Sequence, residues 1–231
     1  MRRSCIGAVA QKLEAHRPHI KSIEDFAEQT QENNEEDIIP QIPNLSTTDI
    51  VIEIHACTSL QSSMLTRTLG SNGTLYVHHH AVRLARHIDL FMLKQAWKCL
   101  VRKTETLRTT FHFSKVINSW VAAVHQESRD AWVEYNIRAP LSESLTDIAN
   151  YHVFHAEADF EQPPWKTTVL KTATEFVLVI SMHHSLYDGE SIDLIFQDLA
   201  KLYQDIQLPP RAPFSVAARA ISKTTENADD F

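Results

Sequence analysis

Residues 174–203, TEFVLVISMHHSLYDGESIDLIFQDLAKLY, decide the fold because a strand pattern changes to a helix pattern within them. Residues 176–180, FVLVI, form a short apolar run rich in β-branched side chains, typical of a strand buried on both faces. Helical spacing of apolar residues then begins, at Ile192, Ile195, Phe196, Leu199 and Tyr203. Gly189 marks the turn and Ser191 is placed to cap the helix. The stretch predicts a strand–loop–helix unit, and α/β folds often carry their chemistry in such a loop.

The predicted loop contains three polar residues of chemical interest, His183, His184 and Asp188. Adjacent residues of an extended chain face opposite sides, so one histidine should point into a cleft and the other into packing. Asp188 is placed either to shape the loop or to meet a cationic partner. A buried loop with satisfied polar groups would explain a lone histidine equally well.

The string HHSLYDGES, residues 183–191, resembles H-H-x-x-x-D-G-x-S, the active-site motif of the condensation domains of nonribosomal peptide synthetases. These domains are relatives of chloramphenicol acetyltransferase. Other family segments are matched at Cys57, Thr58, Gln61 and Met64, at L-R-T-x-F in residues 107–111, at residues 160–164, and at Leu208 to Phe214. The family's second proline and its glycine in the first segment are replaced by Ser59 and Ser63. The resemblance extends from about Asp49 to Phe214.

The resemblance implies an α/β fold: a single chloramphenicol acetyltransferase-like lobe with a mixed sheet, flanking helices and a helical N-terminal appendage. The complete family domain is a V-shaped pair of such lobes with the active site in a tunnel between them, and the second lobe is expected to be missing here. We expect the lobe at residues 48–215, an acidic linker at 30–47 and a tail at 216–231. Residues 1–29 are expected to form the helical segment. Part of it resembles the second half of a peptidyl carrier domain without the serine that carries phosphopantetheine, and an unrelated amphipathic segment explains it equally well.

The resemblance also implies roles for individual residues. His184 is the expected catalytic residue, which either takes a proton from the attacking amine or holds that amine in line. His183 would pack or orient, and the Gly189 N–H would help to stabilise an oxyanion. Asp188 would form a structural ion pair with Arg108, because a buried carboxylate needs a partner. No cofactor or metal would be bound directly, since the substrates are presented on phosphopantetheine arms of carrier domains.

Three functions remain open from the sequence. The first is half of an enzyme that joins carrier-bound aminoacyl or peptidyl thioesters by an amide bond, with carrier domains, the other synthetase modules and the missing lobe as partners. The second is a truncated, non-catalytic remnant or carrier-binding module. The third is a free-standing acyltransferase that uses a coenzyme A thioester.

Composition and charge exclude several other classes. Eight acidic residues and no basic ones lie between Ser22 and Asp49, which leaves the rest of the chain close to neutral and without a basic stripe for nucleic acid. No apolar run is long enough to span a bilayer, so no membrane partner is expected. Three widely spaced cysteines argue against disulfides and fit a reducing, cytoplasmic location.

Two further expectations concern the middle of the chain. His78, His79 and His80 lie in a predicted strand at residues 75–84, where at most two could share a metal ion, so structural or surface histidines are favoured. Residues 120–124 and 131–137 are predicted to pair as a β-hairpin through residues 126–130.

Overall fold

The computed structural model describes residues 50–115, 118–128 and 131–218. The expected N-terminal helical segment and acidic linker lie outside these residues, as does most of the expected C-terminal tail. The strands within these ranges are β1 (Val51–Ala56), β2 (Val77–Ala85), β3 (Thr109–Ser114), β4 (Ser119–His125), β5 (Trp132–Asn136), β6 (Trp165–Lys171) and β7 (Glu175–His183). The helices are α3 (Ser59–Leu69), α4 (Leu90–Lys103), α5 (Leu141–Tyr151) and α6 (Gly189–Tyr203), with short 3₁₀ turns η2 (Glu105–Arg108), η3 (Glu157–Glu161) and η4 (His184–Leu186).

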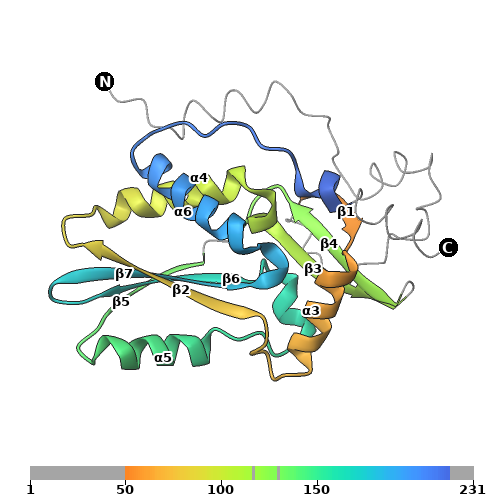
Figure 1. Ribbon diagram of the computed structural model, residues 1–231, viewed down its shortest axis with the longest axis horizontal. Helices are drawn as coiled ribbons and strands as arrows, with labels where there is room; N and C mark the ends of the chain where they lie inside the picture. The colour runs from red at the N-terminus through yellow and green to blue at the C-terminus, as the bar shows by residue number, and fades with distance from the viewer. Residues whose placement is uncertain (1–49, 116–117, 129–130, 219–231) are drawn as a thin grey trace.

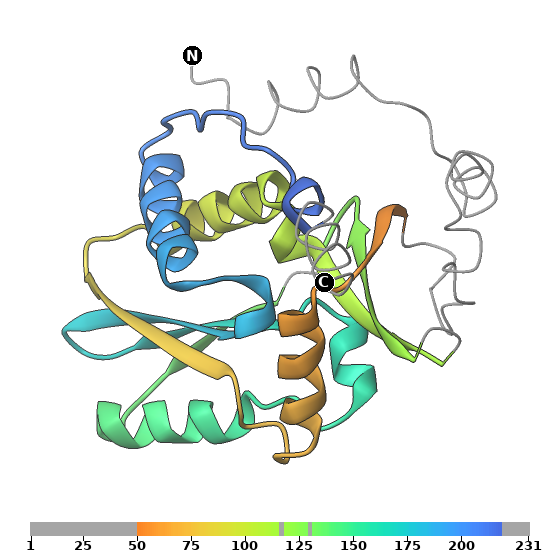
Figure 2. The ribbon, with the colours of Figure 1, turned by 45° about the vertical axis from the view of Figure 1, so that its right-hand side comes forward.

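The strands form two sheets. The larger one has the order β2-β7-β6-β5 and is mixed, because β5 runs parallel to β6 while the other neighbours are antiparallel. The smaller one has the order β1-β4-β3 and is antiparallel. Figure 1 shows α4 and α6 on one face of the larger sheet and α5 on the other, and Figure 2 shows α3 beside the smaller sheet. The expected α/β class with a mixed sheet and flanking helices is therefore confirmed.

Strand β7 is central in the larger sheet and is buried on both faces, as its sequence predicts. Its even-numbered residues, including Leu178 and Ile180, pack in the main core with Trp97 and Leu100 of α4. Its odd-numbered residues Val177 and Val179 pack with Ile148 of α5 in a second cluster, together with Leu170. A strand with helices on both faces needs apolar side chains at every position, which explains why FVLVI lacks alternation.

The predicted hairpin between residues 120–124 and 131–137 is wrong. Strand β4 pairs with β1 and β3 in the smaller sheet, whereas β5 pairs with β6 in the larger one. The strands themselves lie where the sequence predicts them. Two neighbouring strands with a short connection can nevertheless enter different sheets, and period-2 patterning does not identify the pairing partner.

Helix α6 begins earlier than predicted and has a different cap. Its first residue is Gly189, and its N-cap is Asp188, whose carboxylate accepts from the Ser191 N–H at 2.8 Å and from the Ser191 hydroxyl at 2.6 Å. Ser191 is therefore a donor to the cap and not the cap itself. The earlier start places Gly189 in the first turn, where backbone N–H groups lack helical partners.

Several buried histidines in this fold have a hydroxyl group as the hydrogen-bond partner of a ring nitrogen. Thr110 Oγ1 lies 2.9 Å from His112 Nε2 and 2.8 Å from His125 Nε2. On the α5 side of the larger sheet, Ser181 Oγ lies 2.7 Å from His152 Nδ1. Burial lowers the pKa of His112 and of His152 to about 4, because the charged imidazolium loses its hydration.

These buried histidines predict a loss of stability in mild acid. In the unfolded chain they bind protons near pH 6.5, whereas in the folded chain His112 and His152 stay neutral down to about pH 4. The unfolded state therefore binds more protons between these values, and stability falls as pH drops through this window. Each group contributes a slope of at most about 1.4 kcal/mol per pH unit. Urea denaturation at pH 7.5 and pH 5 measures the effect.

The matched control for this prediction is His112→Gln. Glutamine places an amide nitrogen near the Nε2 position beside Thr110 but does not titrate, so the pH dependence should become shallower. Equal stability of the wild-type chain at the two pH values would contradict the prediction.

Candidate active site

The candidate site lies at the end of β7, where the motif loop passes through η4 into α6. His183 is the last residue of β7 and is fully buried, at 0 % exposure. His184 opens η4 and is partly exposed. The expected division between one packed and one accessible histidine is therefore present in the geometry, because the strand alternation sends the two rings to different environments.

His183 is held by hydrogen bonds on both ring nitrogens. Its Nδ1 accepts from the Ser185 N–H at 3.2 Å and lies 2.8 Å from the Ser185 hydroxyl. Its Nε2 lies 2.8 Å from Thr68 Oγ1 of α3. Because Nδ1 accepts from a backbone N–H, we assign the proton to Nε2, which donates to the threonine. Burial, reinforced by the neighbouring His184 and His78, lowers the pKa of His183 to about 3, so this residue is neutral and structural.

Helix α3 supports the loop at a second point. Thr58 caps the helix with a capping box that involves Gln61. The Gln61 amide also donates to the Ser185 carbonyl at 3.0 Å. The opening family segment therefore positions the motif loop in addition to packing. Leu60 of the same helix is 66 % exposed.

His184 makes ring contacts on two sides. Its ring centroid lies 5.1 Å from that of His78 and 5.0 Å from that of Tyr187. Its Nδ1 atom is buried and has no hydrogen-bond partner among the described residues. The other ring nitrogen, Nε2, is not among the buried unpaired atoms, so it is the nitrogen that can reach solvent.

The Gly189 N–H begins the first turn of α6, five residues after His184. An added Cβ at Gly189 would meet no atom within 4 Å, so the space beside this backbone is open. A backbone N–H at a helix start, next to open space, is a suitable donor for a developing negative charge.

The structure does not bring Arg108 and Asp188 together. Asp188 is exposed, and its pKa is lowered mainly by the Ser191 hydrogen bonds. Arg108 is buried and donates through Nη1 to the carbonyls of His125 and Gln126, the latter at 3.3 Å. Burial lowers the pKa of Arg108, and Glu105 partly opposes this shift. The structure does not contain the predicted ion pair. Asp188 takes Ser191 as its partner, whereas Arg108 donates to two backbone carbonyls and keeps a buried Nε with no hydrogen-bond partner among the described residues.

The three consecutive histidines divide between the two faces of β2. His78 and His80 face α6 and both contact the Tyr187 hydroxyl, at 2.8 and 2.9 Å. His79 faces α5, where its Nδ1 lies 2.8 Å from Ser181 Oγ. All three rings thus take hydroxyl groups as partners. Within the described ranges, no group of three or more metal-ligating side chains occurs.

Sequence reasoning missed the contribution of His78, His80 and Tyr187 to this site. The alternation of β2 indicates that His78 and His80 share a face. Their meeting with Tyr187 depends on the pairing of β2 with β7, in which Val77 lies opposite His183. No local pattern encodes that register.

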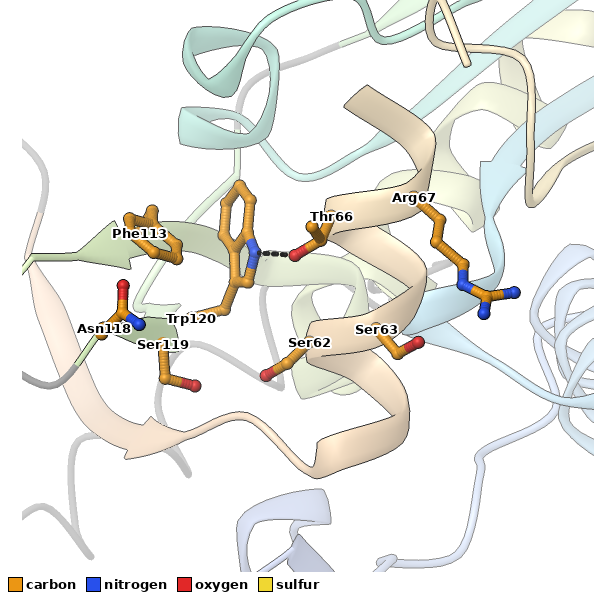
Figure 3. Close-up of a pocket in the computed structure, with 8 residues that line it drawn as sticks. All are labelled: Ser62, Ser63, Thr66, Arg67, Phe113, Asn118, Ser119 and Trp120. Carbon is orange, nitrogen blue, oxygen red and sulfur yellow. Dashed lines mark hydrogen bonds between the residues drawn. The ribbon is translucent and has the colours of Figure 1, made fainter. Parts of the chain in front are cut away.

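A separate hollow of about 310 Å³ lies between α3 and the smaller sheet. Figure 3 shows Trp120 donating to Thr66 at its edge, while the guanidinium of Arg67 points away on the far side of the helix. Its other lining residues are Ser62, Ser63, Phe113, Asn118 and Ser119. Because Arg67 turns away and the rest are uncharged, the hollow offers no acid–base pair.

Within the described residues, no helix is both long and apolar enough to cross a membrane.

Comparison with known proteins shows the family of this chain. A sequence model of the condensation domain matches residues 51–228. Nonribosomal peptide synthetase sidC of Aspergillus fumigatus is 32% identical over 232 residues, covering 100% of this chain and 5% of that protein. Nonribosomal peptide synthetase sidN of Epichloe festucae is 35% identical over 184 residues, covering 79% of this chain and 4% of that protein. The chain belongs to the condensation domain family.

Solved structures support the same fold. The crystal structure of holo T3CT superposes with a TM-score of 0.62 at 19% identity, covering 90% of this chain and 46% of that one. A point mutant of the starter condensation domain of rhizomide synthetase RzmA gives a TM-score of 0.61 at 15% identity, covering 75% of this chain and 44% of that one. The chain thus spans less than half of these structures and about one twentieth of the two synthetases.

The separation of Arg108 and Asp188 predicts independent contributions to stability. Asp188→Ala should lower the free energy of unfolding by about 1 kcal/mol, because α6 loses its cap. Arg108→Met should also destabilise, because two carbonyls lose their donor. With no shared partner, the two changes should add to within about 0.5 kcal/mol in a double-mutant cycle measured by urea denaturation.

Asp188→Asn serves as the control, because asparagine also caps helices. A coupling energy well above about 1 kcal/mol between Arg108 and Asp188 would show that the ion pair forms in solution.

Proposed function

We propose that this chain is the first lobe of a condensation domain that forms an amide bond between carrier-bound aminoacyl or peptidyl thioesters. The observation that carries the proposal is the contrast at the end of β7. His183 is locked in the core by hydrogen bonds, and the next residue, His184, is partly exposed with Nδ1 buried. Such an arrangement presents one imidazole nitrogen, at a defined place, to a reacting amine.

In the proposed reaction, the amine nitrogen of the acceptor attacks the thioester carbonyl carbon of the donor. A carbon–nitrogen bond forms and the carbon–sulfur bond breaks. The amine proton passes to His184 and then to the departing thiolate, or passes directly to that thiolate while His184 holds the amine in line. Both routes yield one amide and one free thiol. The Gly189 N–H is suited to stabilise the oxyanion formed during attack.

The partners in this proposal are the donor and acceptor carrier domains, which bring the substrates on phosphopantetheine arms, and the remaining synthetase modules. A second lobe would supply the wall opposite His184. Support for a second lobe comes from the solved structures of similar fold, of which this chain covers 46% and 44%.

One observation favours the alternative of a non-catalytic, carrier-binding module. The carboxylate of the motif is not clamped by Arg108 but caps α6, so the expected brace of the loop is absent. The loop is nevertheless braced by Thr68 and Gln61 of α3, which supports the catalytic proposal.

The experiment uses a complete condensation domain that contains this chain, with donor and acceptor carriers loaded with aminoacyl thioesters. His184→Ala should lower the rate of amide formation by about 10²- to 10⁴-fold, the usual contribution of a general base. Product appearance is followed by mass spectrometry of the acceptor carrier.

His87→Ala is the matched control, because His87 is exposed and precedes α4 away from the motif loop. It should leave the rate unchanged. Equal rates for wild type and His184→Ala would refute the catalytic proposal, and carrier binding without product would then favour the non-catalytic module.

A further inference from the structure

Tyr187 and two histidines of β2 form a hydrogen-bonded unit beside His184. The Tyr187 hydroxyl lies 2.8 Å from His78 Nδ1 and 2.9 Å from His80 Nε2. The tyrosine belongs to the motif loop, and the histidines belong to the edge strand of the larger sheet. The unit therefore joins two segments that are far apart in the sequence, and we call it the Tyr187 bridge.

The Tyr187 bridge imposes a proton arrangement. A phenol donates one hydrogen bond and accepts others, so it donates to one imidazole nitrogen and accepts from an N–H of the other. Of the two ring nitrogens that face the phenol, one in His78 and one in His80, one must then carry a hydrogen and the other must not. Tyr187 is buried at 8 % exposure, and burial raises its pKa to about 12, so the phenol keeps its proton.

The Tyr187 bridge is also packed in place. His80 meets Tyr187 at a ring-centroid distance of 5.5 Å and Phe196 of α6 at 6.3 Å, both nearly perpendicular. Edge-to-face contacts of this kind define ring orientation as well as distance. Both the hydrogen bonds and the ring contacts restrict the Tyr187 ring.

His184 depends on this unit for its orientation. Among the described residues its Nδ1 has no hydrogen-bond partner, so the usual anchor of a catalytic imidazole is absent. The ring is flanked by Tyr187 at 5.0 Å and by His78 at 5.1 Å between centroids. Two members of the Tyr187 bridge thus contact the residue whose second nitrogen is available to a substrate.

We propose that Tyr187, held between His78 and His80, is a positioning residue that orients the imidazole of His184. The effect of this positioning on amide formation rests on the function proposed above. The orientation of the His184 ring by Tyr187 does not depend on that function. The bridging hydroxyl is the part of Tyr187 that matters, because it links the phenol to both histidines.

The first test measures amide formation in the complete condensation domain. Tyr187→Phe keeps the ring and removes the hydroxyl. It should lower kcat by about ten-fold, because the imidazole of His184 is then misplaced relative to the amine. KM should change less than about two-fold. His80→Leu should have the same effect. His80→Gln keeps an amide nitrogen near the Nε2 position and should retain most of the rate, a rescue that a purely space-filling role would not give.

His79→Asn is the control on the other face of β2. Asparagine keeps a polar atom near the Nδ1 position, which contacts Ser181, and this face lies opposite the Tyr187 bridge. The kcat of this variant should therefore equal that of the wild type. Where His184→Ala lowers kcat, an unchanged kcat in Tyr187→Phe, or equal losses in His80→Leu and His80→Gln, would overturn the proposal.

The second test does not need activity. In the 231-residue chain, the imidazole ¹H–¹⁵N signals of His184 should shift or broaden in Tyr187→Phe and His80→Leu, and stay in place in His80→Gln and His79→Asn. Unmoved His184 signals in Tyr187→Phe would overturn the proposal even if kcat falls.

The two tests separate failure of this proposal from failure of the proposed function. If Tyr187→Phe moves the His184 signals but neither it nor His184→Ala changes amide formation, Tyr187 orients His184 and the catalytic assignment is wrong. If His184→Ala abolishes product while Tyr187→Phe changes neither signals nor rate, the function stands and the positioning role is wrong.

Discussion

The hydrogen bonds of His183 are the constraint on which the candidate site depends. This imidazole is completely buried, and burying a polar ring is unfavourable unless its nitrogens are paired. Thr68 of α3 and Ser185 of the motif loop provide the partners. These hydrogen bonds fix the loop conformation relative to α3. They also fix the position of His184, the partly exposed residue that follows directly at the end of β7.

Hydroxyl groups between imidazoles recur through the structure. Thr110 links His112 and His125, Ser181 links His79 and His152, and Tyr187 links His78 and His80. A hydroxyl both donates and accepts, so it satisfies two neutral histidines at once without a charged partner. The fold thus buries several histidines beside hydroxyl groups, and the lowered pKa of His112 and of His152 couples its stability to acid.

In Arg108 and Asp188, hydrogen bonds to nearby residues compete with an ion pair between residues that are far apart in the sequence. Asp188 caps α6 within its own turn, and Arg108 covers two carbonyls at the end of β4. Bringing the two together would release these bonds and require a buried carboxylate, whose desolvation offsets much of the attraction. In this lobe the motif loop is braced from α3 through neutral hydrogen bonds instead.

The amino-acid sequence by itself determined the strand at 176–180, the helix after Gly189, and the alternate orientation of His183 and His184. All three follow from residue spacing along one segment. Only the tertiary structure decided that β4 and β5 enter different sheets, that Asp188 caps α6 without reaching Arg108, and that Tyr187 meets His78 and His80. The physical reason is that strand pairing, register and the partners of buried polar groups are settled by contacts between distant segments. Local periodicity says which face a side chain occupies, and it carries no information about what lies opposite that face.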